Sequence, residues 1–167
     1  MKRIAFLLIC SSLFLVSCGT KKPADDKASK DESSMDSGKG DGLTLELNGD
    51  SDSNTAGALS TVYFDYDSSS LTGNSKKTLE ANATYLKANE KIDIQVEGHC
   101  DERGGIQYNL ALGERRARSV KDYLVALGVK SSRVKIVSMG KEKPIAFGHD
   151  DESWSKNRRG NFVITAK

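Results

Sequence analysis

A chain of 167 residues is long enough for one domain of ordinary size, with residues to spare for segments that need not fold. With 37% hydrophobic and 29% charged residues, the composition is that of a soluble globular protein, although the apolar residues are unevenly spread. The 25 basic residues barely exceed the 23 acidic ones. Nucleic-acid binding requires a concentrated excess of Lys and Arg, so we expect no nucleic-acid partner.

The first 17 residues have the pattern of a secretory signal peptide. Lys2 and Arg3 precede an apolar run from residue 4 to residue 16, and small residues surround Cys18. As a helix this run would extend roughly 20 Å, short of the roughly 30 Å hydrocarbon core of a bilayer. Residues 15–18, Leu-Val-Ser-Cys, resemble the lipobox of bacterial lipoproteins, in which the cysteine sulfur receives diacylglycerol and the chain is cut just before it. The alternative is an ordinary secretory signal that happens to contain a cysteine.

Processing before Cys18 would change both the charge and the thiols. Losing Lys2 and Arg3 leaves 23 basic against 23 acidic residues, and Cys100 becomes the one unmodified cysteine, so no internal disulfide is expected. Two or more acyl chains anchor a protein firmly. Gly19 follows the lipidated position where Asp would signal retention in the inner membrane, so the enterobacterial sorting pattern predicts the outer membrane.

Residues 18–60 are predicted to be a lipidated N-terminus followed by a disordered linker, because Lys, Asp, Ser and Gly dominate and large apolar residues are few. A coil of this length would span roughly 35–40 Å on average, and stretched it would reach roughly 140–150 Å. Leu43–Leu47 alternates like a short strand and is interpreted as an arm lying on the domain.

The ordered domain is expected at residues 61–167. In chain order, the patterns predict a strand at 62–66, a helix at about 73–89 capped by Ser69, Ser70 or Thr72, and an alternating strand at 92–98. A helical stripe of apolar and small residues then runs from Leu110 to Leu127 and stops at Gly128. Strands at 133–138 and 161–165 complete the order βαβαβ plus a closing strand. The predicted fold is an α/β two-layer sandwich with helices on one face of a mixed four-stranded sheet.

Several spaced motifs resemble one known family, the C-terminal domain of outer-membrane protein A. They are Gly98-His99-Cys100-Asp101-Glu102-Arg103-Gly104, Tyr108-Asn109, Ala111-Leu112-Gly113-Glu114-Arg115-Arg116-Ala117 and Asn157-Arg158-Arg159. Two further segments, Tyr63-Phe64-Asp65 and Gly140-Lys141-Glu142-Lys143-Pro144, narrow the resemblance to its peptidoglycan-associated lipoproteins (Pal). The resemblance covers about residues 60–167, and the lipobox and linker also fit it.

The resemblance implies binding to the peptide stem of peptidoglycan, chiefly to its diaminopimelate residue, without catalysis and without a cofactor. Asp101 and Arg116 match the positions that receive the ligand's ammonium and carboxylate. Arg158 matches another ligand-side arginine, while Asn109 and Asn157 are expected to order the site. Phe64 and Leu110 are expected to add apolar contacts. The family also binds TolB, a periplasmic partner in the Tol-Pal system that draws the outer membrane inward during division, and competition between TolB and peptidoglycan is expected.

Other interpretations of the same residues stay open. Asp101 could merely cap its loop while Arg116 pairs with a surface acid such as Glu102, and Cys100 could serve as a small buried residue. An enzyme or metal site built on His99, Cys100 and Asp101 is disfavoured, because neighbouring side chains in an extended chain point to opposite faces. At 105–107 and 160–161, in the loop before Tyr108 and at the start of the last strand, the sequence departs from the family pattern.

Overall fold

The computed structural model describes residues 47–167, so the predicted signal peptide, lipobox, Cys18 and residues 43–46 of the proposed arm lie outside the described part. Each predicted helix and strand of the domain is present. They are β1 (Val62–Tyr63), α1 (Gly73–Ala88), β2 (Asp93–His99), α2 (Ile106–Ala126), β3 (Val134–Gly140) and β4 (Arg159–Ala166), with a short 3₁₀ turn at Ser131–Arg133. Among residues 47–167, no helix is long and apolar enough to cross a membrane.

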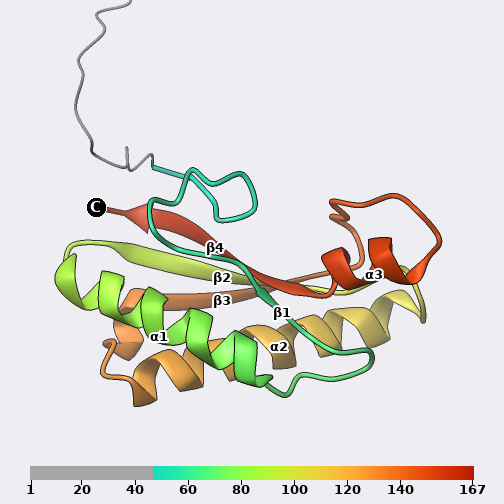
Figure 1. Cartoon of the computed structure of the whole chain (residues 1–167), viewed down its shortest axis with the longest axis horizontal. Helices are drawn as coiled ribbons and strands as arrows, with labels where there is room; N and C mark the ends of the chain where they lie inside the picture. The colour runs from blue at the N-terminus through green and yellow to red at the C-terminus, as the bar shows by residue number, and fades with distance from the viewer. Residues whose placement is uncertain (1–46) are drawn as a thin grey trace, which may run out of the picture. The chain divides into compact units, whose positions relative to one another are not determined.

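The four strands form one mixed sheet in the order β1-β4-β2-β3, with α1 and α2 on one face of it (Figure 1). β2 runs parallel to β3 and antiparallel to β4, while β1 is antiparallel to β4. This arrangement confirms the predicted two-layer α/β sandwich. Because β2 is an inner strand, the loop that follows it leaves the middle of the sheet's end.

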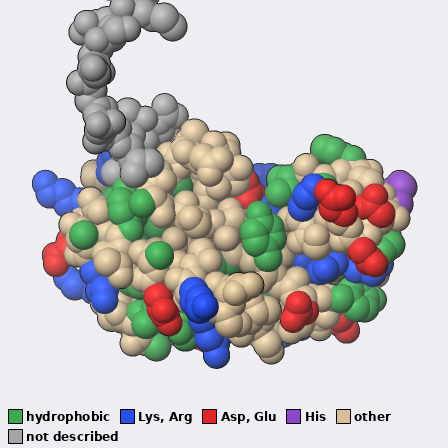
Figure 2. Space-filling view, viewed as in Figure 1, with side chains coloured by type: hydrophobic (Ala, Val, Ile, Leu, Met, Phe, Trp, Pro, Cys, Tyr) green, Lys and Arg blue, Asp and Glu red, His purple; other side chains and the backbone are tan. Residues whose placement is uncertain are grey.

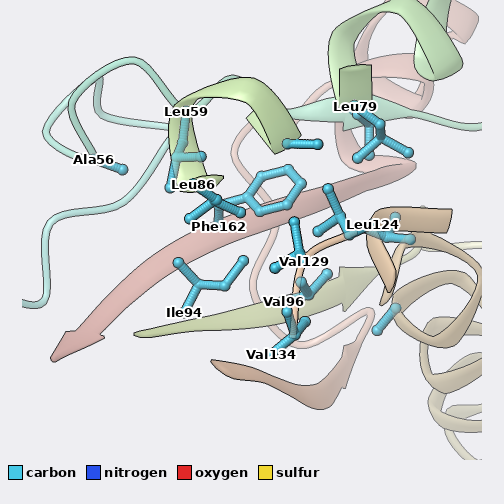
Figure 3. Close-up of a cluster of buried hydrophobic side chains, with 14 of the residues drawn as sticks. Ala56, Leu59, Leu79, Leu86, Ile94, Val96, Leu124, Val129, Val134 and Phe162 are labelled. Atoms are coloured by element: carbon cyan, nitrogen blue, oxygen red, sulfur yellow. The ribbon is translucent and has the colours of Figure 1, made fainter. Parts of the chain in front are cut away.

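The core lies between the sheet and the two helices (Figure 3). Four side chains of the sheet are fully buried and pack against the apolar stripes of the helices: Ile94 and Val96 of β2, and Phe162 and Ile164 of β4. The α1 stripe is the predicted one, Leu79, Ala83 and Leu86, and Thr72 is the residue that caps this helix, accepting from the backbone N–H of Ser75 at 3.1 Å. The spacing of apolar residues therefore located both helical faces.

The ordered domain begins before residue 61, where the sequence patterns predicted its start. Asn48 and Ser51 donate backbone hydrogen bonds to Ile164 and Phe162 of β4, each at 2.9 Å, so this segment continues the edge that β1 covers further along. Ala56 and Leu59 are buried in the core. The composition of this segment is that of a linker, but two buried apolar residues and backbone pairing to β4 outweigh it.

An additional helix, α3 (Asp151–Asn157), was not predicted. Seven residues with a single tryptophan are too short for an apolar stripe, so periodicity gives no signal here. Its capping pattern was available in the sequence: Asp150 accepts from the backbone N–H of Ser153 at 2.8 Å, two acids follow in the first turn, and Lys156 lies in the last.

Two glycines allow β2 and α2 to approach closely beside the site. A Cβ placed on Gly98 of β2 would overlap the carbonyl oxygen of Gly113 in α2, and a Cβ on Gly113 would lie 2.6 Å from the carbonyl oxygen of Gly98. Backbone atoms cannot yield as the end of a side chain can. Small residues at both positions are therefore needed to bring Arg116, one turn along α2, to the end of β2.

We expect Gly98→Ala to lower the free energy of unfolding by about 1–3 kcal/mol or more, because the added methyl group must push α2 away from the sheet. Gly73→Ala is the matched control: nothing lies within 4 Å of its added Cβ at the start of α1, so a change of less than about 1 kcal/mol is expected. Urea unfolding monitored by circular dichroism measures both, and equal effects would contradict the close approach.

Candidate functional site

A cavity of about 160 Å³ lies at the end of β2, where the predicted site residues converge. Its wall comes from the loop after β1, the loop after β2 and the first half of α2, with the lining residues Tyr66, Asp67, Cys100, Asp101, Arg103, Gly104, Tyr108, Asn109, Leu112 and Arg116. Three predicted site residues, Asp101, Asn109 and Arg116, therefore share one cavity. It is small enough to suit the end of one amino-acid side chain and not a whole drug-sized ligand.

Arg116 is the largest fully buried side chain of the described residues, and it is 0% exposed. Its Nε, Nη1 and Nη2 donate to the backbone carbonyls of Ser68, His99 and Asp65 at 2.8, 2.8 and 3.0 Å. Burial lowers the pKa of the guanidinium from its ordinary value. Since a guanidinium carries five N–H groups, at most two remain for an acceptor that enters the cavity.

Asp101 lies two residues beyond β2 and is surrounded by donors. Its Oδ1 accepts from the backbone N and the Nε of Arg103, and its Oδ2 accepts from Nη2 of Arg103 at 2.7 Å and from Nη1 of Arg158 at 3.2 Å. Burial alone would raise the pKa of Asp101, but these hydrogen bonds outweigh it and hold the pKa below its ordinary value. The carboxylate is therefore ionised at neutral pH.

The loop-capping interpretation of Asp101 is thus correct in part, because one of its oxygens accepts from the backbone two residues later. The proposed pairing of Arg116 with Glu102 is wrong. Glu102 instead accepts from Nε1 of Trp154 at 2.9 Å and contacts Nδ1 of His149 at 2.7 Å. Cys100 is buried, and burial raises the pKa of its thiol, in agreement with a small packing role.

Of the remaining predicted residues, Asn109 lines the cavity, whereas Arg158 and Phe64 lie outside its lining and line a neighbouring cavity. Arg158 reaches Asp101 from the side of β4 and also donates from Nε to the carbonyl of Phe64 at 3.1 Å. Phe64 is buried beneath Arg116, whose guanidinium carbon lies 5.2 Å from the ring centroid. Asn109 donates to the carbonyl of Arg103 at 2.8 Å and so fixes the loop after β2.

The other two predicted residues, Asn157 and Leu110, also lie outside the lining of this cavity. Asn157 is buried and accepts from the backbone N–H groups of Ile145 and Ala146, so it orders the loop before α3. Leu110 packs beside Gly140 of β3. Leu112 supplies the apolar wall instead. With 3.6 residues per turn, side chains two positions apart on a helix point in roughly opposite directions, so Leu112 and Leu110 lie on different sides of α2.

Three residues that were not predicted as part of the site form a stack beside the cavity: the guanidinium of Arg103 lies against the rings of Tyr66 and Trp154. The guanidinium carbon of Arg103 lies 4.0 Å from the centroid of each aromatic ring. Figure 2 shows acidic, basic and histidine side chains gathered around α3 and the loop before it. The Asp101-Glu102-Arg103 spacing was a usable signal for an ion pair, but the aromatic partners are 37 and 51 residues distant in sequence from Arg103.

His99 and Asp101 line different cavities, so the consecutive residues of this motif do not converge on one point. His99 lies with Glu97 on the face of the sheet opposite the helices, where its Nε2 is 3.4 Å from Glu97 Oε2. Within residues 47–167, no group of three or more His, Cys, Asp and Glu side chains is arranged to hold a metal ion.

We expect Asp101→Asn to lower the free energy of unfolding by about 1–3 kcal/mol at pH 7, since two arginines lose their counter-ion. The folded pKa of Asp101 is depressed, so its stabilising contribution is present above the unfolded pKa, near 3.9, and is lost as pH falls through the folded pKa. Urea unfolding of wild type and variant from pH 7 to pH 3 should show their difference shrinking below about pH 4. A difference independent of pH would contradict this account.

Known proteins resemble this chain in both sequence and fold. The OmpA family profile matches residues 63–158. The chain is 49% identical over 102 residues to the peptidoglycan-associated lipoprotein of Pseudomonas aeruginosa, covering 61% of this chain and 60% of that relative. It thus spans about three fifths of the length of that protein. The lipoproteins of the same name from Haemophilus influenzae and Rhizobium meliloti are 42% and 37% identical, with 76% and 95% of this chain and 83% and 85% of theirs covered.

Solved structures give the same result. The peptidoglycan-associated lipoprotein of Burkholderia pseudomallei superposes with a TM-score of 0.60 at 46% identity, covering 62% of this chain and 88% of that one. The C-terminal domain of Helicobacter pylori MotB, at 22% identity and a TM-score of 0.61, covers 65% of this chain and 86% of its own and shares the fold alone. The chain therefore belongs to the OmpA family and, within it, to the peptidoglycan-associated lipoproteins.

Proposed function

We propose that this protein is an outer-membrane lipoprotein that binds peptidoglycan non-covalently and so tethers the membrane to the cell wall, without catalysing a reaction. One observation carries the proposal: an ionised carboxylate, Asp101, and a buried guanidinium, Arg116, line the same small cavity. The names of the relatives, peptidoglycan-associated lipoproteins, point to the same ligand.

The chemistry of the cavity suits the free end of a diaminopimelate residue in the peptide stem. That end carries an ammonium and a carboxylate a few ångströms apart. Asp101 is an acceptor for the ammonium, while the unused N–H groups of Arg116 are donors for the carboxylate. Arg158 adds positive charge from the β4 side. A stem with lysine at this position would lack the carboxylate that Arg116 needs.

Ion pairs alone do not account for tight binding. Each charge-assisted hydrogen bond contributes about 1.5–3 kcal/mol, so two pairs give roughly 3–6, whereas micromolar affinity requires about 8 kcal/mol. Leu112, Tyr66 and Tyr108 line the cavity and supply apolar contact area. The hydroxyl of Tyr108 donates to Asp67, another residue of the lining, and so joins α2 to the loop after β1. A membrane anchor would further raise the local concentration of wall.

The anchor is the lipid expected on Cys18, which lies outside the described residues. We also propose TolB and the other Tol proteins as partners, with a role in invagination of the outer membrane during division and in envelope integrity. This part of the proposal follows from the resemblance to the family. TolB and peptidoglycan are expected to compete for overlapping surfaces of the domain.

We predict that the purified full-length protein in detergent co-sediments with diaminopimelate-type peptidoglycan and that Asp101→Asn stays in the supernatant. Losing one charged pair should weaken binding by about tenfold or more. Asp122→Asn is the matched control, because Asp122 is an exposed carboxylate further along α2. A folded Asp101→Asn variant that sediments like wild type would show that the ligand binds elsewhere. Because Arg116 also supports the fold, Arg116→Lys should be compared only after its stability has been measured.

A second prediction concerns the anchor. Cys18→Ser should abolish incorporation of radiolabelled palmitate and release the protein from the washed membrane fraction, because no acyl acceptor remains at the lipobox. Cys100→Ser should remain labelled and membrane-bound, since Cys100 is a buried thiol of the folded domain. Labelling of the Cys18→Ser protein would contradict lipidation at this residue.

A further inference from the structure

The carboxylate of Asp101 has no vacant acceptor position. A carboxylate offers about four lone-pair sites. Oδ1 accepts from the backbone N–H of Arg103 at 3.1 Å and from its Nε at 3.2 Å, and Oδ2 accepts from Nη2 of Arg103 at 2.7 Å and from Nη1 of Arg158 at 3.2 Å. An ammonium that is to hydrogen-bond to Asp101 must therefore displace one of these donors.

The guanidinium of Arg103 is the donor that can leave. The backbone N–H of Arg103 is fixed by the turn after β2, whereas the Arg158 side chain is 13% exposed and is also bonded to the carbonyl of Phe64. The Arg103 side chain is 29% exposed, and both side-chain hydrogen bonds that the described residues give it end on Asp101. Its remaining contacts are the faces of Tyr66 and Trp154.

We propose that Arg103 is a specificity-determining residue: it is an internal counter-ion on Asp101 that the ligand's ammonium displaces on binding. This inference rests on the proposed function and deepens it. Exchange of one cation for another keeps the buried carboxylate compensated throughout. A ligand with a neutral group at this position offers no replacement charge, so Arg103 stays in place and blocks Asp101.

Trp154 provides a direct readout of this exchange. It is the single tryptophan of the chain. Its ring stacks on Arg103, and its Nε1 donates to Glu102, one residue from Asp101. Departure of the guanidinium removes a cation from the ring face, so the emission of Trp154 should change when the ligand binds.

The test uses the full-length protein in detergent and the soluble stem tripeptide that ends in meso-diaminopimelate, beside the same peptide acetylated on its side-chain amino group. Affinity is measured by calorimetry and Trp154 by fluorescence. Arg103→Met keeps a long side chain between the rings but cannot donate to Asp101. Arg118→Met is the matched control, because Arg118 is an exposed arginine paired with Glu114 on α2.

The tripeptide should change the emission of wild type and should bind Arg103→Met about three- to tenfold more tightly, because the competing internal cation is gone. Arg118→Met should bind like wild type, and the acetylated peptide should neither bind tightly nor change the emission. Weaker or equal binding by a folded Arg103→Met variant would overturn the inference, as would binding to wild type without a change in emission. Failure of wild type to bind the tripeptide at all would instead reject the proposed function.

Discussion

The site depends on the burial of one cation. Arg116 projects from α2 and donates to carbonyls on two other stretches of chain, Asp65 and Ser68 after β1 and His99 at the end of β2. A buried guanidinium without hydrogen-bond partners would cost several kcal/mol, so these carbonyls must remain within hydrogen-bonding distance of Arg116. The residue that contacts the proposed ligand is therefore also the residue that fixes the cavity wall, and the cavity is largely pre-formed.

The charges around the cavity are unequal, and this imbalance determines what can bind. Arg103 and Arg158 pair with the buried carboxylate of Asp101, and Arg116 lines the same cavity, whereas the other acid of the lining, Asp67, is exposed. Burial opposes ionisation of Asp101, but hydrogen bonds from Arg103 and Arg158 hold its pKa below the ordinary value. The N–H groups of Arg116 that remain unused can receive a carboxylate. A purely cationic ligand could displace Arg103 from Asp101 but would offer Arg116 no acceptor, and a purely anionic one would leave Asp101 paired with Arg103. A zwitterionic group satisfies both parts of the site, which is the chemistry of the diaminopimelate end.

The fold, and the elements that carry several of the predicted site residues, could be predicted from the sequence because both depend on local patterns. Apolar spacing fixed the faces of α1 and α2, and the family motifs placed Asp101, Asn109 and Arg116 on the elements that meet at the cavity. The contribution of Arg103 was not predictable, because its stack joins Tyr66, which follows β1, to Trp154 on a helix of seven residues. Residues 48–60 were misassigned for a related reason: their composition is polar, and only contact with β4 shows that they are ordered.

That earlier domain boundary shortens the tether on which the proposed function relies. If lipids hold Cys18 in the membrane, the part of the chain between the anchor and the described domain ends near Leu47 and not at residue 60, which leaves roughly 30 residues. Fully stretched at about 3.3–3.6 Å per residue, they reach roughly 100 Å, against roughly 140–150 Å for the longer estimate. On the proposed function, peptidoglycan more than about 100 Å from the membrane surface would lie beyond this maximum length. The protein would then hold membrane and wall together only where they are already closer than that.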